Sequence, residues 1–371
     1  MRRCLALLTA LLLSACSTAP LVPTGTVFDD SLFSAPSQPV NRSQVFAISD
    51  AMKRYLEVDL AAEVRSKGER AALAEALSRR ERLLLEYDTA TTRTASQAFD
   101  ARAGNCLSLV VMSAALARHL NLPVTFQALV GHESWSRSGD LSFVNGHVNV
   151  TVAQRLVDRV GYYGTDPLLR VEFGGISAGR GQALRTVSEA TILAMFMNNR
   201  AAEHLVRGAL DDAYAHAREA LRQDPTYAAA YNTLGVVYQR RGLQAAAERA
   251  YRAALVRDDA NKPALQNLAR LLDDAGRGPE ATAFHARLAR LERDPPFAHF
   301  DRGVAAARVG DYATARDEIR LEMRRDPDYH EFHFWLAVAL YGLGETAPAR
   351  DHLETAMRNS LTARDQAIRD W

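Results

Sequence analysis

Several features are scarce in this chain of 371 residues. It holds three cysteines and three tryptophans, and its formal net charge is +1 at pH 7. A charge so close to neutral gives no reason to expect nucleic acid or a strongly charged partner. After the first fifteen residues no apolar run is long enough to span a bilayer. Histidine, cysteine and acidic residues do not cluster at the spacing of metal ligands, so we predict no metal and no cofactor.

The composition is that of a folded chain, with 48% hydrophobic and 24% charged residues. The length is too great for one ordinary hydrophobic core. It predicts two domains with tails.

The N-terminus has the pattern of an export signal. Arg2 and Arg3 precede an apolar run over 5–13, and small residues lead up to Cys16. This pattern predicts a signal peptide over 1–15. Residues 13–16 resemble a bacterial lipobox, which implies a lipid anchor on Cys16 and, in a diderm bacterium, the periplasmic face of the outer membrane. The alternative is an ordinary secretory signal.

The cysteine count gives Cys106 a special status. Cys4 lies inside the signal and Cys16 is the predicted lipidation site, so Cys106 has no disulfide partner in its own chain. A lone thiol in an oxidising envelope is either buried and inert or kept for its chemistry.

The segment before Cys106 divides into a tether and two helices. Residues 16–43 are rich in Ser, Thr, Pro and Gly, which predicts a flexible tether. Ser49 is placed to cap a first amphipathic helix, and Gly68 separates it from a second one.

Cys106 begins an apolar stretch that predicts a buried helix over 106–118. Gly104 permits a close backbone approach, and Asn105 is a good N-cap. The first turn of a helix favours a thiolate, because unsatisfied N–H groups and the macrodipole point toward it. The alternative is a small core residue in an apolar helix.

Three strands are predicted after this helix, over 124–130, 146–152 and 168–173, from β-branched residues and alternation of period two. A polar loop is expected over 132–145. Further on, Thr186 with Glu189 has the pattern of a capping box for a following helix.

The order of these elements is similar to that of the transglutaminase-like superfamily. The likeness covers about 90–175 and is carried by residues 102–106, the Ala-rich helix, Leu122 with Pro123, and Gly146 with His147. It implies a papain-like α+β domain over 44–180 with a Cys, His, Asp/Glu triad. Cys106 would be the nucleophile and His147 the acid and base.

The third member of that triad is Glu172 or Asp166. If the second and third strands form an antiparallel hairpin, the start of one lies beside the end of the other, which favours Glu172 as the neighbour of His147. Asp166 would then lie about 20 Å away at roughly 3.3 Å per residue. Asp166 stays the alternative.

The second half repeats every 34 residues and resembles the tetratricopeptide repeat. Five units are predicted over 186–360, followed by a capping helix over 361–371. The units start at Ala194, Ala228, Lys262, Pro296 and His330. Position 8 holds Ala201, Gly235, Ala269, Gly303 and Ala337, and position 20 holds Ala213, Ala247, Ala281, Ala315 and Ala349. Small residues at these positions let paired helices approach, and stacked units are expected to bury one continuous core.

Such arrays bind peptides or proteins on the face formed by the first helix of each unit. Position 5 of that helix holds Asn198, Asn232, Gln266, Phe300 and Phe334, which are the predicted peptide-binding residues. The alternative is that some of them pack against the neighbouring domain or in the interior of the superhelix.

Two functions stay open. The first is an envelope-anchored cysteine hydrolase or acyl transferase acting on a peptide or amide bond, with repeats that bind a protein or peptide partner. The second is a non-catalytic envelope scaffold that acts through its repeats.

Overall fold

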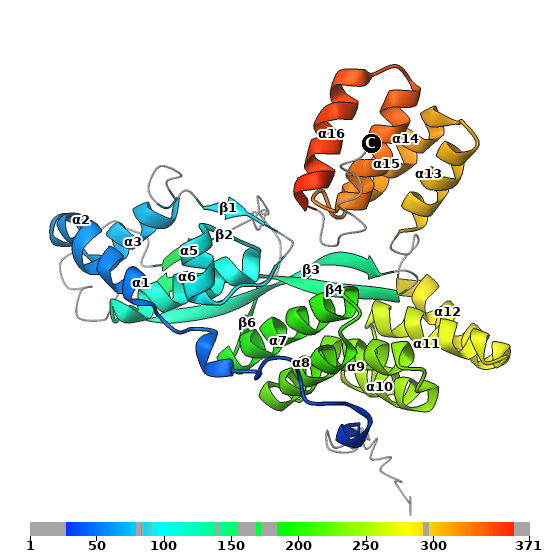
Figure 1. Cartoon of the computed structure of the whole chain (residues 1–371), viewed down its shortest axis with the longest axis horizontal. Coiled ribbons are helices and arrows are strands. Elements are labelled where there is room, and N and C mark those ends of the chain that lie inside the picture. Colours follow the sequence, from blue (N-terminus) through cyan, green and yellow to red (C-terminus); the bar gives the residue numbers. More distant parts are fainter. Residues whose placement is uncertain are drawn as a thin grey trace, which may run out of the picture.

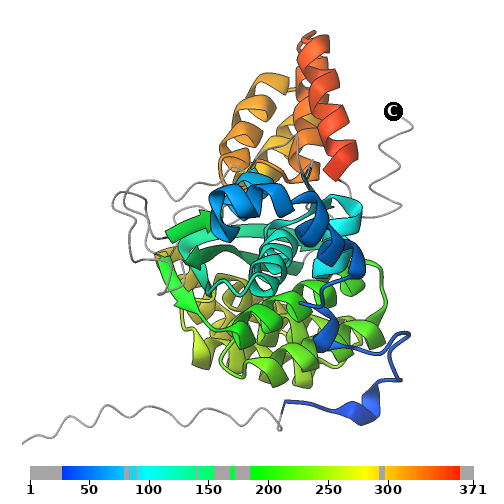
Figure 2. The ribbon, with the colours of Figure 1, turned by 90° about the vertical axis from the view of Figure 1, so that its left-hand side faces the viewer.

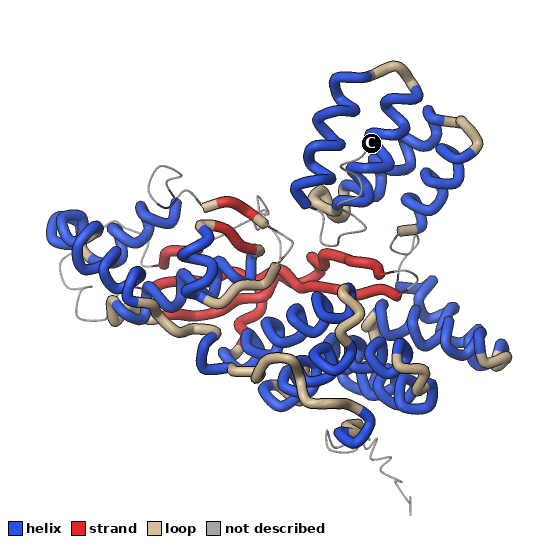
Figure 3. Tube along the Cα trace, viewed as in Figure 1, coloured by secondary structure: helices blue, strands red, loops and turns tan. Residues whose placement is uncertain are grey.

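The computed structural model describes residues 27–78, 83, 85–88, 91–138, 141–153, 168–171, 184–291 and 297–359. Its first half is an α+β region and its second half is a series of helices (Figures 1 and 3). The predicted signal peptide, the lipidation site Cys16 and the predicted helix over 361–371 lie outside these ranges. Within them, no helix is both long enough and apolar enough to cross a bilayer.

The α+β region begins with helices, which precede the four strands of its main sheet. They are η2 (Asp30–Leu32), η3 (Arg42–Gln44), α1 (Asp50–Arg54), the π-helix η4 (Tyr55–Asp59), α2 (Ala61–Lys67), α3 (Glu69–Ser78), α5 (Ala95–Ala101) and α6 (Cys106–His119). The strands are β1 (Glu86–Tyr87), β2 (Ala103–Gly104), β3 (Val124–Ser138), β4 (Leu141–Ala153), β5 (Leu168–Val171) and β6 (Leu184–Val187).

Side-chain caps define where these helices start. As predicted, Ser49 accepts a hydrogen bond from the Met52 N–H at the start of α1, and Asn105 caps α6. The predicted cap at Thr186 is wrong, because Thr186 lies within β6, where it pairs with Gln127 of β3. Ser188 caps α7 instead, since it follows the strand with an extended backbone.

The main sheet has the strand order β5-β4-β3-β6, and every neighbouring pair is antiparallel. The antiparallel pairing of β4 and β5, on which the argument for Glu172 depends, is therefore present, with Val150 facing Val171.

The loop predicted over 132–145 is wrong. Strands β3 and β4 continue through most of it as a long hairpin, in which Glu133 faces Gly146 and Ser138 faces Leu141. Cross-strand hydrogen bonds satisfy the backbone whatever the side chains are, so a polar stretch does not exclude a strand.

Strand β4 is buried on both faces near its end. Val148, Val150 and Val152 have no exposed area, and the alternating Asn149 and Thr151 are also buried. The strand contacts α6 as well as helices α7, α9 and α11 of the second half.

The second half consists of five helical hairpins. Their helices are α7 (Glu189–Val206) with α8 (Leu210–Gln223), α9 (Ala228–Arg240) with α10 (Gln244–Arg257), α11 (Lys262–Asp274) with α12 (Gly278–Leu291), α13 (Ala298–Arg308) with α14 (Tyr312–Met323), and α15 (His330–Gly342) with α16 (Thr346–Asn359). The second helix of each hairpin starts 34 residues after the previous one. The turn before each carries a glycine with positive φ, namely Gly208, Gly242, Gly276, Gly310 and Gly344. The five predicted repeats are therefore confirmed as helical hairpins.

Small residues allow the two helices of a hairpin to touch. A Cβ on Gly235 would lie 2.5 Å from the Tyr251 ring, and one on Gly303 would lie 2.6 Å from Ile319. These are positions 8 and 24 of the second and fourth units.

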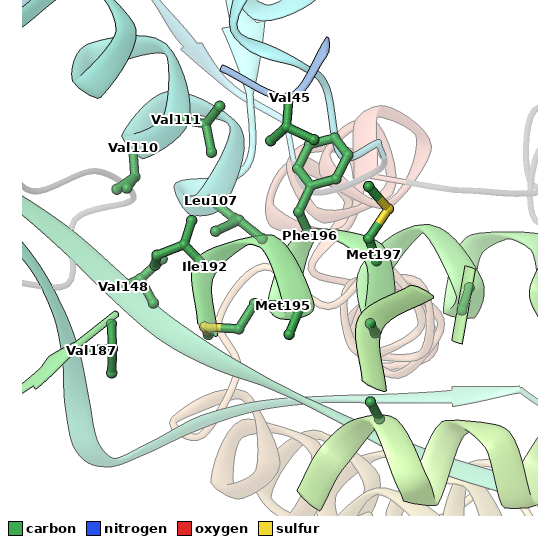
Figure 4. Packing of buried hydrophobic residues seen from close by; sticks show 14 of the residues in the cluster. Val45, Leu107, Val110, Val111, Val148, Val187, Ile192, Met195, Phe196 and Met197 are labelled. Carbon is green, nitrogen blue, oxygen red and sulfur yellow. The ribbon is translucent and has the colours of Figure 1, made fainter. Parts of the chain in front are cut away.

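The predicted continuous core is interrupted between the third and fourth repeats. Buried residues of the α+β region and of the first three repeats form one cluster, and residues 297–349 form another. Figure 4 shows the first cluster where Leu107 of α6, Val148 of β4 and Ile192 of α7 come together. The core boundary therefore lies inside the repeats, and not between the two halves of the sequence.

Residues 27–43 belong to the predicted tether, yet they pack along the repeats (Figure 2). Phe33 stacks on Tyr214 with ring centroids 3.9 Å apart. The Asp29 N–H donates to the hydroxyls of Tyr214 and Tyr238, at 3.0 and 3.1 Å, and the Tyr238 hydroxyl donates to the Val27 carbonyl at 2.8 Å. The predicted flexibility is thus wrong for this segment, because its apolar residues find partners on α8 and α9.

Candidate functional site

Cys106 is the first residue of α6, as predicted, and its thiol is reduced and partly buried. The N-cap Asn105 accepts hydrogen bonds from the N–H and the hydroxyl of Ser108, at 2.9 and 2.8 Å. A Cβ on Gly104 would lie 2.7 Å from the Ser108 Cβ, so only glycine fits there. The sequence before Cys106 therefore fixes a close approach of the chain to the first turn of α6.

His147 lies on β4 with 5% of its surface exposed. Ala128 faces Val148 and Glu133 faces Gly146, so residues 129–132 of β3 oppose His147 alone. Such a bulge changes the direction of side chains and is frequent beside active sites. Because α6 packs on β4, the helix that carries Cys106 and the strand that carries His147 belong to one core.

Glu172 and its alternative Asp166 lie outside the described residues. The described part of β5 ends at Val171, which faces Val150, three residues from His147 along β4. Three residues of a strand span about 10 Å. The identity of the third member stays a prediction.

The chain segment in front of α6 is held by a buried acidic residue that sequence reasoning missed. Glu203 of α7 accepts a hydrogen bond from the Thr92 N–H at 2.6 Å. Burial raises the pKa of the Glu203 carboxyl, and the Arg200 guanidinium 2.7 Å away opposes this. In the sequence Glu203 resembles any exposed helical glutamate, so no local signal could have identified it.

The residues predicted to bind a peptide are largely covered. Asn198 and Asn232 are 2% exposed and Phe300 is 3% exposed, while Gln266 and Phe334 are partly buried. Strand β4 lies against α7, α9 and α11, the helices that carry Asn198, Asn232 and Gln266 (Figure 1).

Specific contacts explain this burial. The Asn267 side-chain N–H donates to the Asn232 side-chain oxygen at 2.9 Å and joins two repeats. Phe300 packs on Phe332 with ring centroids 5.0 Å apart. In this structure Asn198, Asn232 and Phe300 are thus not available to a ligand from solution. The alternative of packing describes Asn232 and Phe300, because each contacts a side chain of the next repeat.

Within the described residues, no three His, Cys, Asp or Glu side chains gather as metal ligands would. His333 and His352 form a pair, with their Nδ1 atoms 2.9 Å apart.

No family model matches this chain, and no curated protein matches it. Solved structures do match. PilF of Pseudomonas aeruginosa is 24% identical, with a TM-score of 0.29 over 47% of this chain and 80% of that one. YrrB, described as a TPR protein with an unusual peptide-binding site, is 20% identical, with a TM-score of 0.26 over 48% of this chain and 92% of that one. The MamA protein is 17% identical, with a TM-score of 0.26 over 50% and 97%.

Proposed function

We propose that this protein is a scaffold of the bacterial cell envelope that binds a protein or peptide partner through its tetratricopeptide-like repeats. Five hairpins at a 34-residue period support the binding array. The lipobox-like residues before Cys16 support a lipid anchor at the periplasmic face of the outer membrane.

One observation supports the binding proposal, and on it we propose the last repeat as the binding surface. Strand β4 covers the first helices of repeats one to three, whereas α15 carries an apolar stripe with exposed area. Phe334 and Val338 are half-buried, and Tyr341 is 67% exposed. These residues follow the i, i+4, i+7 spacing of one helix face. Such a stripe suits an amphipathic helix or an extended apolar peptide.

Site-specific crosslinking in cells tests this surface. A photoreactive amino acid at Tyr341 of the full chain is expected to capture one defined protein, and Phe334→Ala should reduce that yield. The same amino acid at Val309, which is 82% exposed at the end of α13, is the matched control. Capture of the same proteins from both positions, or from neither, would refute the proposed surface.

A second candidate function is thiol chemistry on a peptide or amide bond, as the likeness to the transglutaminase-like superfamily implies. The packing of the Cys106 helix on the His147 strand favours it. The Cys106 thiolate would attack the carbonyl carbon, and His147 would pass the thiol proton to the leaving amine. Water or an acceptor amine would then release the acyl group. Glu172, or Asp166, would orient the imidazole.

Alkylation of Cys106 by iodoacetamide across pH tests this candidate. An activated thiol reacts well below the reference pKa of about 8.5, and His147→Ala should slow the reaction. His119→Ala, at the other end of α6, is the matched control. A rate that is indifferent to His147 would exclude the catalytic pair. Loss of reactivity in Asp166→Ala but not in Glu172→Ala would reassign the third member.

A further inference from the structure

Helix α7 of the first repeat is linked to the thiol helix by a buried carboxylate. The Glu203 side chain is 11% exposed. One oxygen accepts from the Thr92 N–H at 2.6 Å, and the other meets the guanidinium groups of Arg200 at 2.7 Å and Arg207 at 3.5 Å. Thr92 is itself only 2% exposed. A buried N–H of this kind depends on its protein acceptor, because water does not reach it.

The contact continues from Thr92 into the first turn of α6. The Thr92 hydroxyl accepts from the Asn105 side-chain N–H at 2.9 Å. This bond orients the Asn105 amide so that its oxygen points at the Ser108 N–H, 2.9 Å away. The Ser108 hydroxyl in turn accepts from the Arg93 N–H at 2.8 Å. Residues 92–93 and 105–108 are therefore closed into one hydrogen-bonded ring.

The two arginines explain why Glu203 can hold this ring. Burial raises the pKa of the Glu203 carboxyl, and two guanidinium groups oppose that rise, those of Arg200 one turn earlier on α7 and of Arg207, the residue that follows α7. A charged acceptor forms a stronger hydrogen bond with an N–H than a neutral one.

We infer that Glu203 is a positioning residue for the end of α6 that carries Cys106, so that the first repeat and the thiol site form one mechanical unit. The link stands on the hydrogen bonds above. Its consequence for Cys106 chemistry rests on the second proposed function.

Four variants of the full chain test the link. Glu203→Gln removes the charge, and Thr92→Val removes the hydroxyl while keeping the N–H. Thr92→Ser keeps the hydroxyl and should behave as wild type. Glu189→Gln is the matched control, because it breaks the ion pair of α7 with Arg118 at the opposite end of α6.

The readouts are amide hydrogen exchange at Ser108 and Leu109 and the alkylation rate of Cys106 against pH. Thr92→Val loses one hydrogen bond of ordinary strength, which should speed exchange about tenfold. Glu203→Gln keeps an oxygen that can accept from the Thr92 N–H but loses the charge, so it should speed exchange by less than that. Exchange in α13–α16 should not change, and the pH midpoint of alkylation should shift only in these two variants.

Unchanged exchange at Ser108 in Thr92→Val, in a folded protein, would overturn the link. If Glu203→Gln does not fold, the Thr92→Val and Thr92→Ser pair decides. If wild-type Cys106 reacts as an ordinary thiol while exchange still responds, the thiol function falls and the positioning role stands.

Discussion

The first three repeats and the last two share a 34-residue register and the same left-handed glycine in the turn. They nevertheless differ in what they pack against. The first three share one core with the α+β region, and the last two have a core of their own. A repeat pattern therefore specifies the hairpin, while the stacking of neighbouring hairpins depends on the residues at each junction.

The junction between α12 and α13 shows the difference. Within α10, which has neighbours on both sides, seven residues are buried, whereas α12 buries only Ala281 and Leu288. The next helix starts at Ala298, two residues after the unit start at Pro296, and Phe297 before it has φ 67°. A bulky residue with a positive φ has a strained backbone. The packing of the Phe297 ring against Tyr329 and Phe332 holds Phe297 in this conformation.

The largest effect is expected from truncating one buried side chain in each of the two cores. Leu268→Ala in α11 should lower the free energy of unfolding by about 2–5 kcal/mol, and Phe300→Ala in α13 by about 3–5 kcal/mol. Both side chains are buried, one in each cluster. Hydrogen exchange resolved by segment should show that each variant weakens only its own cluster.

Val309→Ala, at an exposed position, is the control and should change stability by less than about 0.5 kcal/mol. One common unfolding transition, shifted equally by both core variants, would contradict the division into two cores.

An intermediate effect is expected from pH, because each region carries a histidine pair between the two helices of a repeat. In the first repeat the rings of His204 and His216 lie 4.8 Å apart. Burial is the main reason why the pKa of His204 falls to about 4, and the nearby His216 lowers it further. Burial also lowers the pKa of His216.

In the last repeat, His333 donates from Nε2 to the Pro327 carbonyl at 2.7 Å, so its Nδ1 accepts from His352. Burial lowers the pKa of both. Asp328 on the His333 side and Asp351 on the His352 side oppose this decrease. The groups that reinforce it are Arg358 and His330 on the His333 side and Arg320 on the His352 side.

Because these pKa values are lower in the folded state than the ordinary 6.5, the folded chain binds fewer protons than the unfolded chain. Their contribution to stability is complete above pH 6.5 and decreases as the pH falls below it. Acid titration followed by segment-resolved exchange should show His352→Asn flattening this dependence only in α13–α16, and His204→Asn only in the first region. If neither substitution changes how stability depends on pH, the dependence would have to come from the carboxylates and not from the histidines.

The smallest effect is expected where the N-terminal segment joins the first region. Tyr238→Phe removes the hydroxyl that contacts Val27 and Asp29, which should reduce stability by about 1 kcal/mol. Limited proteolysis should then cut residues 27–44 faster, while the last two repeats are unaffected. Tyr341→Phe is the control on an exposed tyrosine. Equal cutting of both variants and wild type would show that the hydroxyl does not hold the segment.

The sequence by itself determined the local features of this protein. The 34-residue hairpins, the caps Ser49 and Asn105 and the close approach at Gly104 follow from spacing, propensity and backbone sterics, which act over a few residues. The placement of Cys106 at a helix start was predictable for the same reason.

Only the tertiary structure decided what the elements pack against. It placed β4 on the repeat face, buried Asn232 and Phe300, fastened residues 27–44 to Tyr214 and Tyr238, and joined Glu203 to Thr92. These contacts join residues far apart in the chain, and their energy comes from excluding water at surfaces that neither segment reveals alone.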